Sequence, residues 1–286
     1  TTTRYAALMK GDIDLIQNSL DPDKVELIES SMQDKFNVLK QPRLALTYIG
    51  FNFRNQTIAN PEVRKAIYKA IDRVSLIKYR MRSSEQPATG LFPPGNFYED
   101  KSLNPVSYSP EEAKKELIAS GLTLPIPLSL KVSSANRSLV EITKNIAALL
   151  SEVGFNAKVE SLENSLFQDQ IKKGAAQIWV ASWVGFKDPD ILRFVFASDM
   201  VPPNGGNRGA YSNKEVDALL KKGREEFNPM KRREYYNKVQ EILNVDTPFV
   251  FLWHGSTVAV FSKKVKGYEL YADGRYASLT HTEKIE

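Results

Sequence analysis

The sequence predicts an α/β fold in which a parallel sheet is covered by helices. Short apolar segments alternate with longer amphipathic ones over residues 128–132, 137–153, 155–159, 165–173 and 177–182. The short segments are typical of buried strands, and the longer ones carry apolar residues at helical spacing. Gly154 and Gly174 follow the two longer segments, where glycine favours a helix end. Because strands joined through helices form right-handed crossovers, we expect a parallel sheet covered on both faces.

The stretch from Tyr48 to Arg73 joins an expected strand, residues 45–53, to an expected helix. Side chains alternate along a strand, which gives this one two faces: Ile49, Phe51 and Phe53 on one, and Tyr48, Gly50 and Asn52 on the other. We expect the first face to pack in a core and the second to be free to meet a ligand.

The helix after this strand is expected to begin at Pro61. Asn60 is a favourable N-cap, proline suits the first helical position, and the helix dipole favours Glu62 in the first turn. Apolar residues recur at steps of three and four as far as Val74. A single helix that packs on a core is therefore expected from residue 61 to residue 74.

The rest of the chain divides into elements on similar grounds. Before residue 45 we expect a helix that ends at Gly11, a strand at 13–16, a helix from Asp21-Pro22 and a strand at 36–39. Ser109 and Glu112 form a capping box for a helix that ends at Gly121. Later helices are expected at 190–197, from a cap at Ser212 with Glu215, and from Asn228-Pro229 to Asp246, followed by strands at 249–253, 257–261 and 265–271.

Composition limits the classes of protein to be considered. A chain of 286 residues, 42% of them apolar, can form one large or two ordinary domains. Its apolar stretches are all shorter than the ~20 residues needed to span a bilayer. The absence of cysteine excludes disulfides and thiolate metal sites. An apolar pattern is already under way at Tyr5, so we expect the chain to belong to a longer protein.

The formal net charge of +5 does not by itself indicate that the protein binds nucleic acid. The densest basic run, at residues 231–233, lies beside Glu234 on an expected amphipathic helix, and such charges are usually a solvated helix face. We therefore expect no nucleic-acid partner.

Catalytic motifs are not found. The only histidines, His254 and His281, belong to no spaced metal pair and to no nucleophile turn. The glycine-rich run from Gly205 to Gly209 lacks the Gly-Lys-Ser/Thr ending of a phosphate-binding loop, and we expect it to be a flexible loop. We expect no catalytic residue, no metal site, no cofactor and no enzymatic activity.

Several motifs, taken together, resemble a known family. The sequence is similar to the extracellular solute-binding proteins of family 5, which serve peptide, nickel and related importers of the ABC type. The matching residues follow the family's order and cover nearly the whole chain: Gly11 to Leu15, Phe51-Asn52, Asn60 to Ala66, Ala70-Ile71-Asp72-Arg73, Ala88-Thr89-Gly90 with Pro93-Pro94, Tyr108 to Ala113, Trp183 with Asp188-Pro189, Tyr211-Ser212-Asn213 and Asp246-Thr247-Pro248. They correspond to the later part of a family member.

The resemblance implies a lobe of the type II periplasmic-binding-protein fold, with partial strands of the other lobe. Residues 1–47 would be a remnant of lobe I, residues 48–248 the ligand-binding lobe II, and residues 249–286 a return to lobe I. The implied function is binding of an oligopeptide-like or other small solute in an interlobe cleft, for delivery to a membrane ABC permease. A ligand-sensing domain of a transcription regulator is the alternative. The resemblance also implies a monomer that is periplasmic or extracellular, either free or anchored as a lipoprotein.

Candidate ligand-binding residues come from strand ends and from the resemblance. Ligands of open α/β sheets bind at the carboxyl ends of the strands, and Trp183 directly follows the expected strand 177–182. Relatives place this tryptophan, the loop after it and a later glycine-rich loop against the ligand. The full set of expected ligand-binding residues is Tyr48, Asn52, Trp183, Gly185, Phe186, Asp188, Arg208 and Tyr211.

The class of ligand is narrowed by two substitutions. Peptide-binding relatives hold the ammonium group of the ligand with an Asp just beyond this tryptophan, and some hold its carboxylate with an Arg three residues before it. Here the Arg position is Val180, and the Asp position is Phe186 or has been lost to a one-residue deletion. An unpaired buried charge costs several kcal/mol, so we expect a blocked, bulkier or non-peptide ligand. Asp188 and Arg208 are the residues that could take over these roles.

Overall fold

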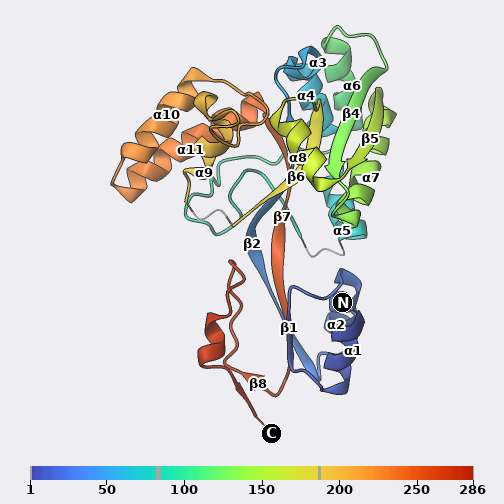
Figure 1. Ribbon diagram of the computed structural model, residues 1–286, viewed down its shortest axis with the longest axis vertical. Coiled ribbons are helices and arrows are strands. Elements are labelled where there is room, and N and C mark those ends of the chain that lie inside the picture. The colour runs from blue at the N-terminus through green and yellow to red at the C-terminus, as the bar shows by residue number, and fades with distance from the viewer. Residues whose placement is uncertain (1, 82–84, 186–187, 286) are drawn as a thin grey trace. The chain divides into compact units, whose positions relative to one another are not determined.

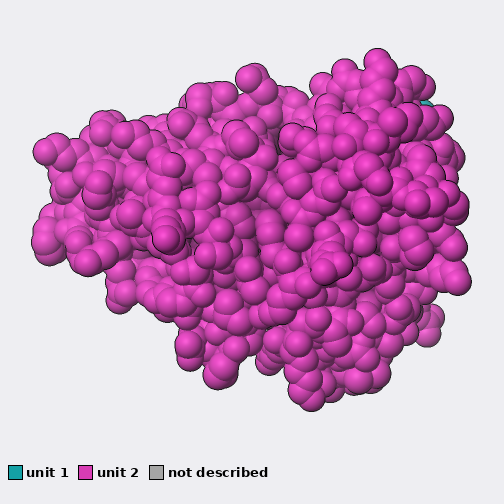
Figure 2. Space-filling model, turned by 90° about the horizontal axis from the view of Figure 1, so that it is seen from above, with its two compact units in different colours: residues 1–45, 75–86, 254–286 teal, residues 46–74, 87–253 magenta. Residues whose placement is uncertain are grey.

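A computed structural model describes residues 2–81, 85–185 and 188–285 (Figure 1). The chain forms two compact units. Unit 1 contains residues 1–45, 75–86 and 254–286, and unit 2 contains residues 46–74 and 87–253, drawn in magenta in Figure 2. The division expected from sequence differs in three segments, because residues 75–86 belong to unit 1, whereas residues 46–47 and 249–253 belong to unit 2. Assignment of the units to lobes I and II remains a prediction.

The parallel sheet of unit 2 confirms the predicted α/β fold. Its strands and helices alternate in the expected order: β4 (Ile126–Ser133), α7 (Arg137–Val153), β5 (Phe155–Leu162), α8 (Asn164–Lys172) and β6 (Ile178–Val184). β4 lies between β5 and β6 and is parallel to both, with Leu130 opposite Val159 on one side and Ile178 on the other. α7 packs on β4 and β5, and α8 packs on β4. Asn136 caps α7 by accepting a 3.0 Å hydrogen bond from the Leu139 N–H.

Two long strands run through the sheet beside this parallel part (Figure 1). β2 (Phe36–Phe51) and β7 (Phe249–Ser262) are neighbours, and β6 is the other neighbour of β2. We expected two separate strands within each of these segments, and this was wrong. The polar residues near Arg43 and near Ser256 look like breaks in the sequence. In the structure β2 and β7 are neighbours in the sheet, and each continues through these polar residues.

The helix expected from residue 61 to residue 74 is interrupted. α3 (Gln56–Ala59) precedes α4 (Pro61–Lys69), and a new helix, α5 (Arg73–Arg80), begins after a short break. Val74, the last residue of the expected apolar face, is therefore 65% exposed. Arg73 is buried instead, and its guanidinium donates hydrogen bonds of 2.6–2.9 Å to the carbonyls of Ala88, Phe251 and Val106. One buried arginine thus ties together three segments of unit 2.

The remaining helices of unit 2 follow the expected order. They are α6 (Pro110–Ala119), α9 (Ile191–Phe196), the short 3-10 helix η1 (Ser198–Met200), α10 (Lys214–Glu225) and α11 (Pro229–Asp246). The caps at Ser109 and Asn228 are confirmed. The cap of α10 was assigned wrongly, because Asn213 and not Ser212 accepts from the N–H groups of Glu215 and Val216.

Unit 1 is built from the beginning of the chain, the segment 75–86 and the end of the chain. Its elements include α1 (Thr2–Lys10), β1 (Leu15–Gln17), α2 (Pro22–Ser31), β8 (Val265–Lys266), η2 (Ala277–Thr280) and β9 (Glu283–Lys284), while β3 (Gln86–Pro87) lies at a unit boundary. β1 is antiparallel to β7, with Leu15 opposite Phe261. The strand expected at 265–271 is only two residues long, although Tyr268 and Leu270 are buried. In the described part of the chain, no helix is both long and apolar enough to cross a bilayer.

Candidate ligand-binding site

Trp183 lies within the last residues of β6, not after the strand as we expected. It is half-buried, and its ring contacts three neighbours in unit 2. Tyr48 stacks on it at 6.3 Å between centroids and an angle of 10°, and Phe194 meets it edge-on at 6.0 Å. The guanidinium carbon of Arg208 lies 5.2 Å from the ring centroid. Trp183 is therefore an aromatic surface with a cation on one side.

Tyr48 is buried, with only 1% of its surface exposed. It also stacks on Phe249, with centroids 4.2 Å apart. Asn52 is 3% exposed, and a Cβ added at Gly50 would lie 2.3 Å from the ring of Trp179. Both faces of this part of β2 are thus covered, which corrects the expectation that one face is free. Glycine at position 50 permits the close approach of Trp179.

The hydroxyl of Tyr48 is surrounded by hydrogen-bond donors. Burial raises the pKa of Tyr48, and the charge of Arg208 and the N–H groups of Trp179 and Trp183 act against this without offsetting it. Both indole nitrogens are buried, and neither makes a hydrogen bond of normal geometry within the described residues. We call Tyr48, Trp179, Trp183 and Arg208 the donor cluster.

Arg208 is positioned by a loop that lies against the end of β2. The N–H of Phe53 donates to the carbonyl of Gly209 at 2.9 Å. Asn207 is 2% exposed and donates hydrogen bonds of 2.9 and 2.8 Å to the carbonyls of Ala197 and Tyr211. This loop, expected to be flexible, is tied down by these contacts.

Two of the predicted site residues are occupied by contacts within the protein. The amide of Asn52 donates to the carbonyls of Gly174 and Ala176 at 2.9 and 2.8 Å, which holds the segment just before β6 against the end of β2. Tyr211 is 4% exposed, and its hydroxyl donates to Asp246. These contacts favour structural roles for Asn52 and Tyr211, and a ligand contact at either residue remains a prediction.

The loop after Trp183 gives the remaining predicted residues. Asp188 pairs with Arg232 at 2.9 Å. Partial burial of Asp188 acts to raise its pKa, but hydrogen bonds from Arg232 and from the Asp190 backbone N–H outweigh this and lower the pKa of Asp188. Gly185 is exposed and has a φ of +75°, a conformation that favours glycine. Phe186 lies outside the described residues. Val180, which takes the place of the family's arginine, is 1% exposed.

Trp179 and Phe194 were not predicted as part of this site. Trp179 could have been found from strand alternation, because residues 179 and 183 of β6 are four apart and so share a face. Phe194 meets Trp183 only through the fold, since α9 brings it there. The structure brings Tyr48, Trp183 and Arg208 together, and these three are the centre of the candidate site.

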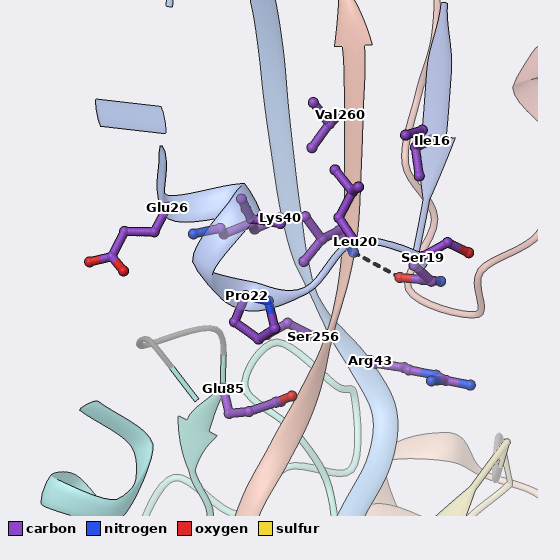
Figure 3. Close-up of a pocket in the computed structure, with 13 residues that line it drawn as sticks. Ile16, Ser19, Leu20, Pro22, Glu26, Lys40, Arg43, Glu85, Ser256 and Val260 are labelled. Atoms are coloured by element: carbon purple, nitrogen blue, oxygen red, sulfur yellow. Dashed lines mark hydrogen bonds between the residues drawn. The ribbon is translucent and has the colours of Figure 1, made fainter. Parts of the chain in front are cut away.

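Unit 1 contains a separate cavity of roughly 180 Å³ (Figure 3). Glu85, Arg43 and Ser256 lie on one side of it, and apolar side chains including Ile16 and Val260 line the other. Burial raises the pKa of Glu85 to about 8, against the effects of the Ser256 backbone N–H and of Arg43. None of the predicted ligand-binding residues lines this cavity. We therefore take the donor cluster, and not this cavity, as the candidate site.

No metal centre is seen in the described residues, where no three His, Cys, Asp or Glu side chains are grouped to hold an ion. His254 is buried on β7, and His281 is exposed beside Thr280. The acidic residues near the donor cluster are held in ion pairs and hydrogen bonds, Asp188 with Arg232 and Asp246 with Tyr211. The chemistry offered by the cluster is therefore aromatic stacking and hydrogen-bond donation.

Comparison with known proteins gives the family. Residues 1–199 match the bacterial extracellular solute-binding proteins, family 5 Middle. The chain therefore belongs to this family of solute-binding proteins. It is 27% identical over 273 residues to heme-binding protein A of Haemophilus influenzae, covering 93% of this chain and 49% of that protein. It is 23% identical over 280 residues to the dipeptide-binding protein of Escherichia coli, covering 96% of this chain and 52% of that protein.

Solved structures show the same fold. The structure of HbpA2 from Haemophilus parasuis superimposes with a TM-score of 0.91 at 22% identity, over 100% of this chain and 56% of that one. DppA from Helicobacter pylori, in complex with the peptide STSA, superimposes with a TM-score of 0.81 at 26% identity, over 99% of this chain and 55% of that one. The fold is that of type II periplasmic binding proteins. The chain spans about half the length of the relatives that it matches.

Proposed function

We propose that the chain is part of the substrate-binding component of an ABC-type importer, and that it binds an oligopeptide-like or other small solute through unit 2. Membership of the solute-binding family supports this proposal. The observation that carries it is the stack of Trp183 on Tyr48 at the carboxyl end of β6, with Arg208 beside it. Ligands of α/β sheets bind at this end of the strands, and a half-buried aromatic ring offers a large contact area there.

The proposed protein binds its ligand and does not transform it. A membrane ABC permease would be the receiving partner, and the protein would act as a monomer in the periplasm or outside the cell, free or lipid-anchored. Relatives include a glutathione-binding protein and a dipeptide-binding protein of Escherichia coli. We propose a related small solute here, with a blocked, bulkier or non-peptide ligand favoured over an unmodified dipeptide, because Val180 is buried and gives no charge to pair with a carboxylate.

The test is to purify the full-length protein from its own host and to examine it by native mass spectrometry. A co-purifying small molecule that is released on denaturation and rebinds in calorimetry is the expected result. Trp183→Ala should weaken rebinding, while Phe227→Ala, which removes a 98% exposed aromatic of the same unit, should not. A protein that carries no ligand, and binds none from a concentrated extract of host metabolites, contradicts the proposal.

A further inference from the structure

The cavity of unit 1 is lined entirely by residues of that unit (Figure 3). One wall is apolar: Ile16, Val25 and Val260 are each at most 5% exposed, and they come from β1, α2 and β7. Exposed charged side chains, including those of Glu26 and Arg43, also line the cavity. The cavity is therefore an apolar space that reaches the surface at a charged rim.

Glu85 lines this space and lacks one of its hydrogen bonds. Its side chain extends toward Ser256 and Arg43 in Figure 3, and its carboxyl group accepts a hydrogen bond from the Ser256 backbone N–H. The other carboxyl oxygen, Oε2, is buried and has no partner in the residues that the structure describes. Burial raises the pKa of Glu85 to about 8, so at neutral pH the group is a carboxylic acid.

The proton of Glu85 determines what this group can bind. A protonated carboxyl group has one O–H donor and keeps acceptor capacity on its other oxygen. Because the Ser256 N–H already donates to one oxygen, we place the proton on Oε2. This O–H has no acceptor among the described residues, and an unmade hydrogen bond inside a protein is unfavourable. The cavity therefore offers one hydrogen-bond donor to a molecule that enters it.

The charges around the cavity disfavour an ionic ligand. Lys40 and Arg43 of β2 line it together with Glu26 of α2, while β1 and β7 contribute uncharged side chains. Lys40 pairs with Glu29 at 2.6 Å. A cationic ligand would have to displace the proton of Glu85 close to Arg43, and an anionic ligand would lose hydration against the apolar wall. The surroundings therefore suit a neutral ligand.

The volume limits the size of this ligand. The cavity measures roughly 180 Å³. An apolar protein cavity of about 150 Å³ holds a benzene molecule. There is room here for a single ring with a small polar substituent. Since the cavity offers a donor but no charge from Glu85, it is a weaker site than the donor cluster for an ionic solute.

We propose that the cavity of unit 1 is a second ligand site, which takes a neutral molecule of the size of a substituted ring whose oxygen accepts a hydrogen bond from Glu85. Ketones, esters, amides and alcohols share such an acceptor. The apolar part of the molecule would lie against Ile16, Val25 and Val260. This site is independent of the proposed function of unit 2, because no residue of the donor cluster lines the cavity.

The experiment uses the full-length protein with ¹³C-labelled isoleucine methyl groups. The Ile16 signal reports on the cavity, and the signal of Ile67, buried on α4 of unit 2, is the internal control; isoleucine-to-valine variants assign both. Acetophenone and benzyl alcohol are the probes. Toluene, which lacks an acceptor, and N-methylpyridinium, a cation of the same shape as toluene, are the controls. At pH 6 we expect both probes to give a saturable shift of Ile16 and none of Ile67, with an affinity about tenfold or more above that of either control.

The pH dependence tests the role of Glu85. From pH 6 to pH 9 the acetophenone affinity of the wild type should fall about tenfold, because most of Glu85 has then lost its proton. N-methylpyridinium should bind more tightly over the same range, because an ionised Glu85 attracts a cation. Glu85→Gln keeps a neutral donor that cannot ionise, so it should bind acetophenone at pH 6 nearly as tightly as the wild type and show no fall at pH 9.

A second variant removes the donor. Glu85→Leu should weaken acetophenone binding about tenfold or more and leave toluene binding unchanged or tighter. Glu234→Gln, at an exposed position of α11, should have no effect on either. An unchanged Ile67 signal and a cooperative thermal transition show that each variant is folded.

The proposal is overturned if neither probe gives a saturable shift of Ile16 at pH 6, which is the result expected if water or another part of the full-length chain fills the cavity. Toluene that binds as tightly as acetophenone, or a wild-type affinity that does not change between pH 6 and pH 9, would also overturn it. Tighter binding of N-methylpyridinium than of acetophenone at pH 6 would make the cavity a cation site instead. None of these results bears on solute binding by unit 2.

Discussion

The donor cluster of unit 2 and the cavity of unit 1 each contain polar atoms without a hydrogen-bond partner in the described residues. These atoms are donors in the donor cluster and a carboxyl oxygen in the cavity. In the donor cluster the unpaired atoms are the indole N–H groups beside Arg208. In the cavity the unpaired atom is an oxygen of Glu85, whose pKa burial raises to about 8. A carboxyl group can relieve burial by keeping its proton, whereas indole and guanidinium groups cannot change state and need a partner from outside.

This comparison explains why the cavity of unit 1 is the weaker candidate for a ligand site. Glu85 keeps its proton near neutral pH and so presents a neutral group, while Arg43 beside it is exposed to water. The cavity therefore contains no buried charge from Glu85 that a ligand would have to neutralise. The donor cluster differs, and its unmatched charge favours a ligand. Four predictions test this contrast, from the largest expected effect to the smallest.

The first prediction concerns the pH dependence of stability from Glu85. The folded protein holds this proton up to about pH 8, and the unfolded chain releases it near 4.5. Between these values the folded state binds more protons, so the free energy of unfolding falls as pH rises. Glu85→Gln cannot ionise, so the wild type should lose about 3 kcal/mol relative to this variant between pH 5 and pH 8.

Urea unfolding at several pH values measures this difference, with Glu234→Gln at an exposed position of α11 as the control. Parallel pH profiles for the wild type and Glu85→Gln would mean that Glu85 is ionised and paired in the native state. This outcome would contradict the statement that Glu85 presents a neutral group in the cavity.

The second prediction concerns the packing of Trp179. A Cβ at Gly50 would lie 2.3 Å from the Trp179 ring, whereas a Cβ at Gly255 would lie 3.4 Å from Ala45 and 3.6 Å from Glu85. Gly50→Ala should therefore destabilise the protein by about 2 kcal/mol, because a tightly packed ring must move. Gly255→Ala, in the other region, should cost clearly less. Equal midpoints in urea for the two variants would show that Trp179 is not fixed by β2.

The third prediction concerns Trp183 as a contact surface. Trp183→Ala should weaken binding of the co-purified solute by tenfold or more, about 1.4 kcal/mol, since a central aromatic often dominates a binding site. Calorimetry measures this loss. Its effect on stability should stay below the ~3–5 kcal/mol that truncation of a fully buried tryptophan costs, because Trp183 is half-buried. A variant that unfolds under native conditions would place Trp183 in the core.

The fourth prediction separates a surface ion pair from a ligand contact. Asp188 is 62% exposed in its pair with Arg232, and such pairs contribute about 0–1 kcal/mol. Asp188→Asn should therefore change the melting temperature very little and leave solute binding unchanged. A large loss of binding with unchanged stability would instead restore Asp188 to the ligand site, in the role that an acidic residue has in peptide-binding relatives.

Local features of the sequence determined much of the fold. The helix 137–153 was predicted with its bounds, since Asn136 accepts a backbone hydrogen bond at its start and Gly154 takes a positive φ at its end. The parallel strands followed from their alternation with helices. These features were predictable because caps, glycine conformations and side-chain spacing act within a few residues of each other.

Other features were decided only by tertiary structure. The sequence of residues 48–52 alternates like a strand with one free face, but Trp179 and Phe249 cover that face from distant segments. The break after Lys69 accompanies the hydrogen bonds of Arg73 to carbonyls in three separate segments. The strand β2 continues past Arg43 as a neighbour of β7 and β6 in the sheet. The sequence alone therefore determined most of the elements and the family, and it indicated Trp183 as a candidate ligand contact. The partners of Tyr48 and Arg208, and hence the excess of donors, arise from contacts between residues far apart in the chain, which no local pattern records.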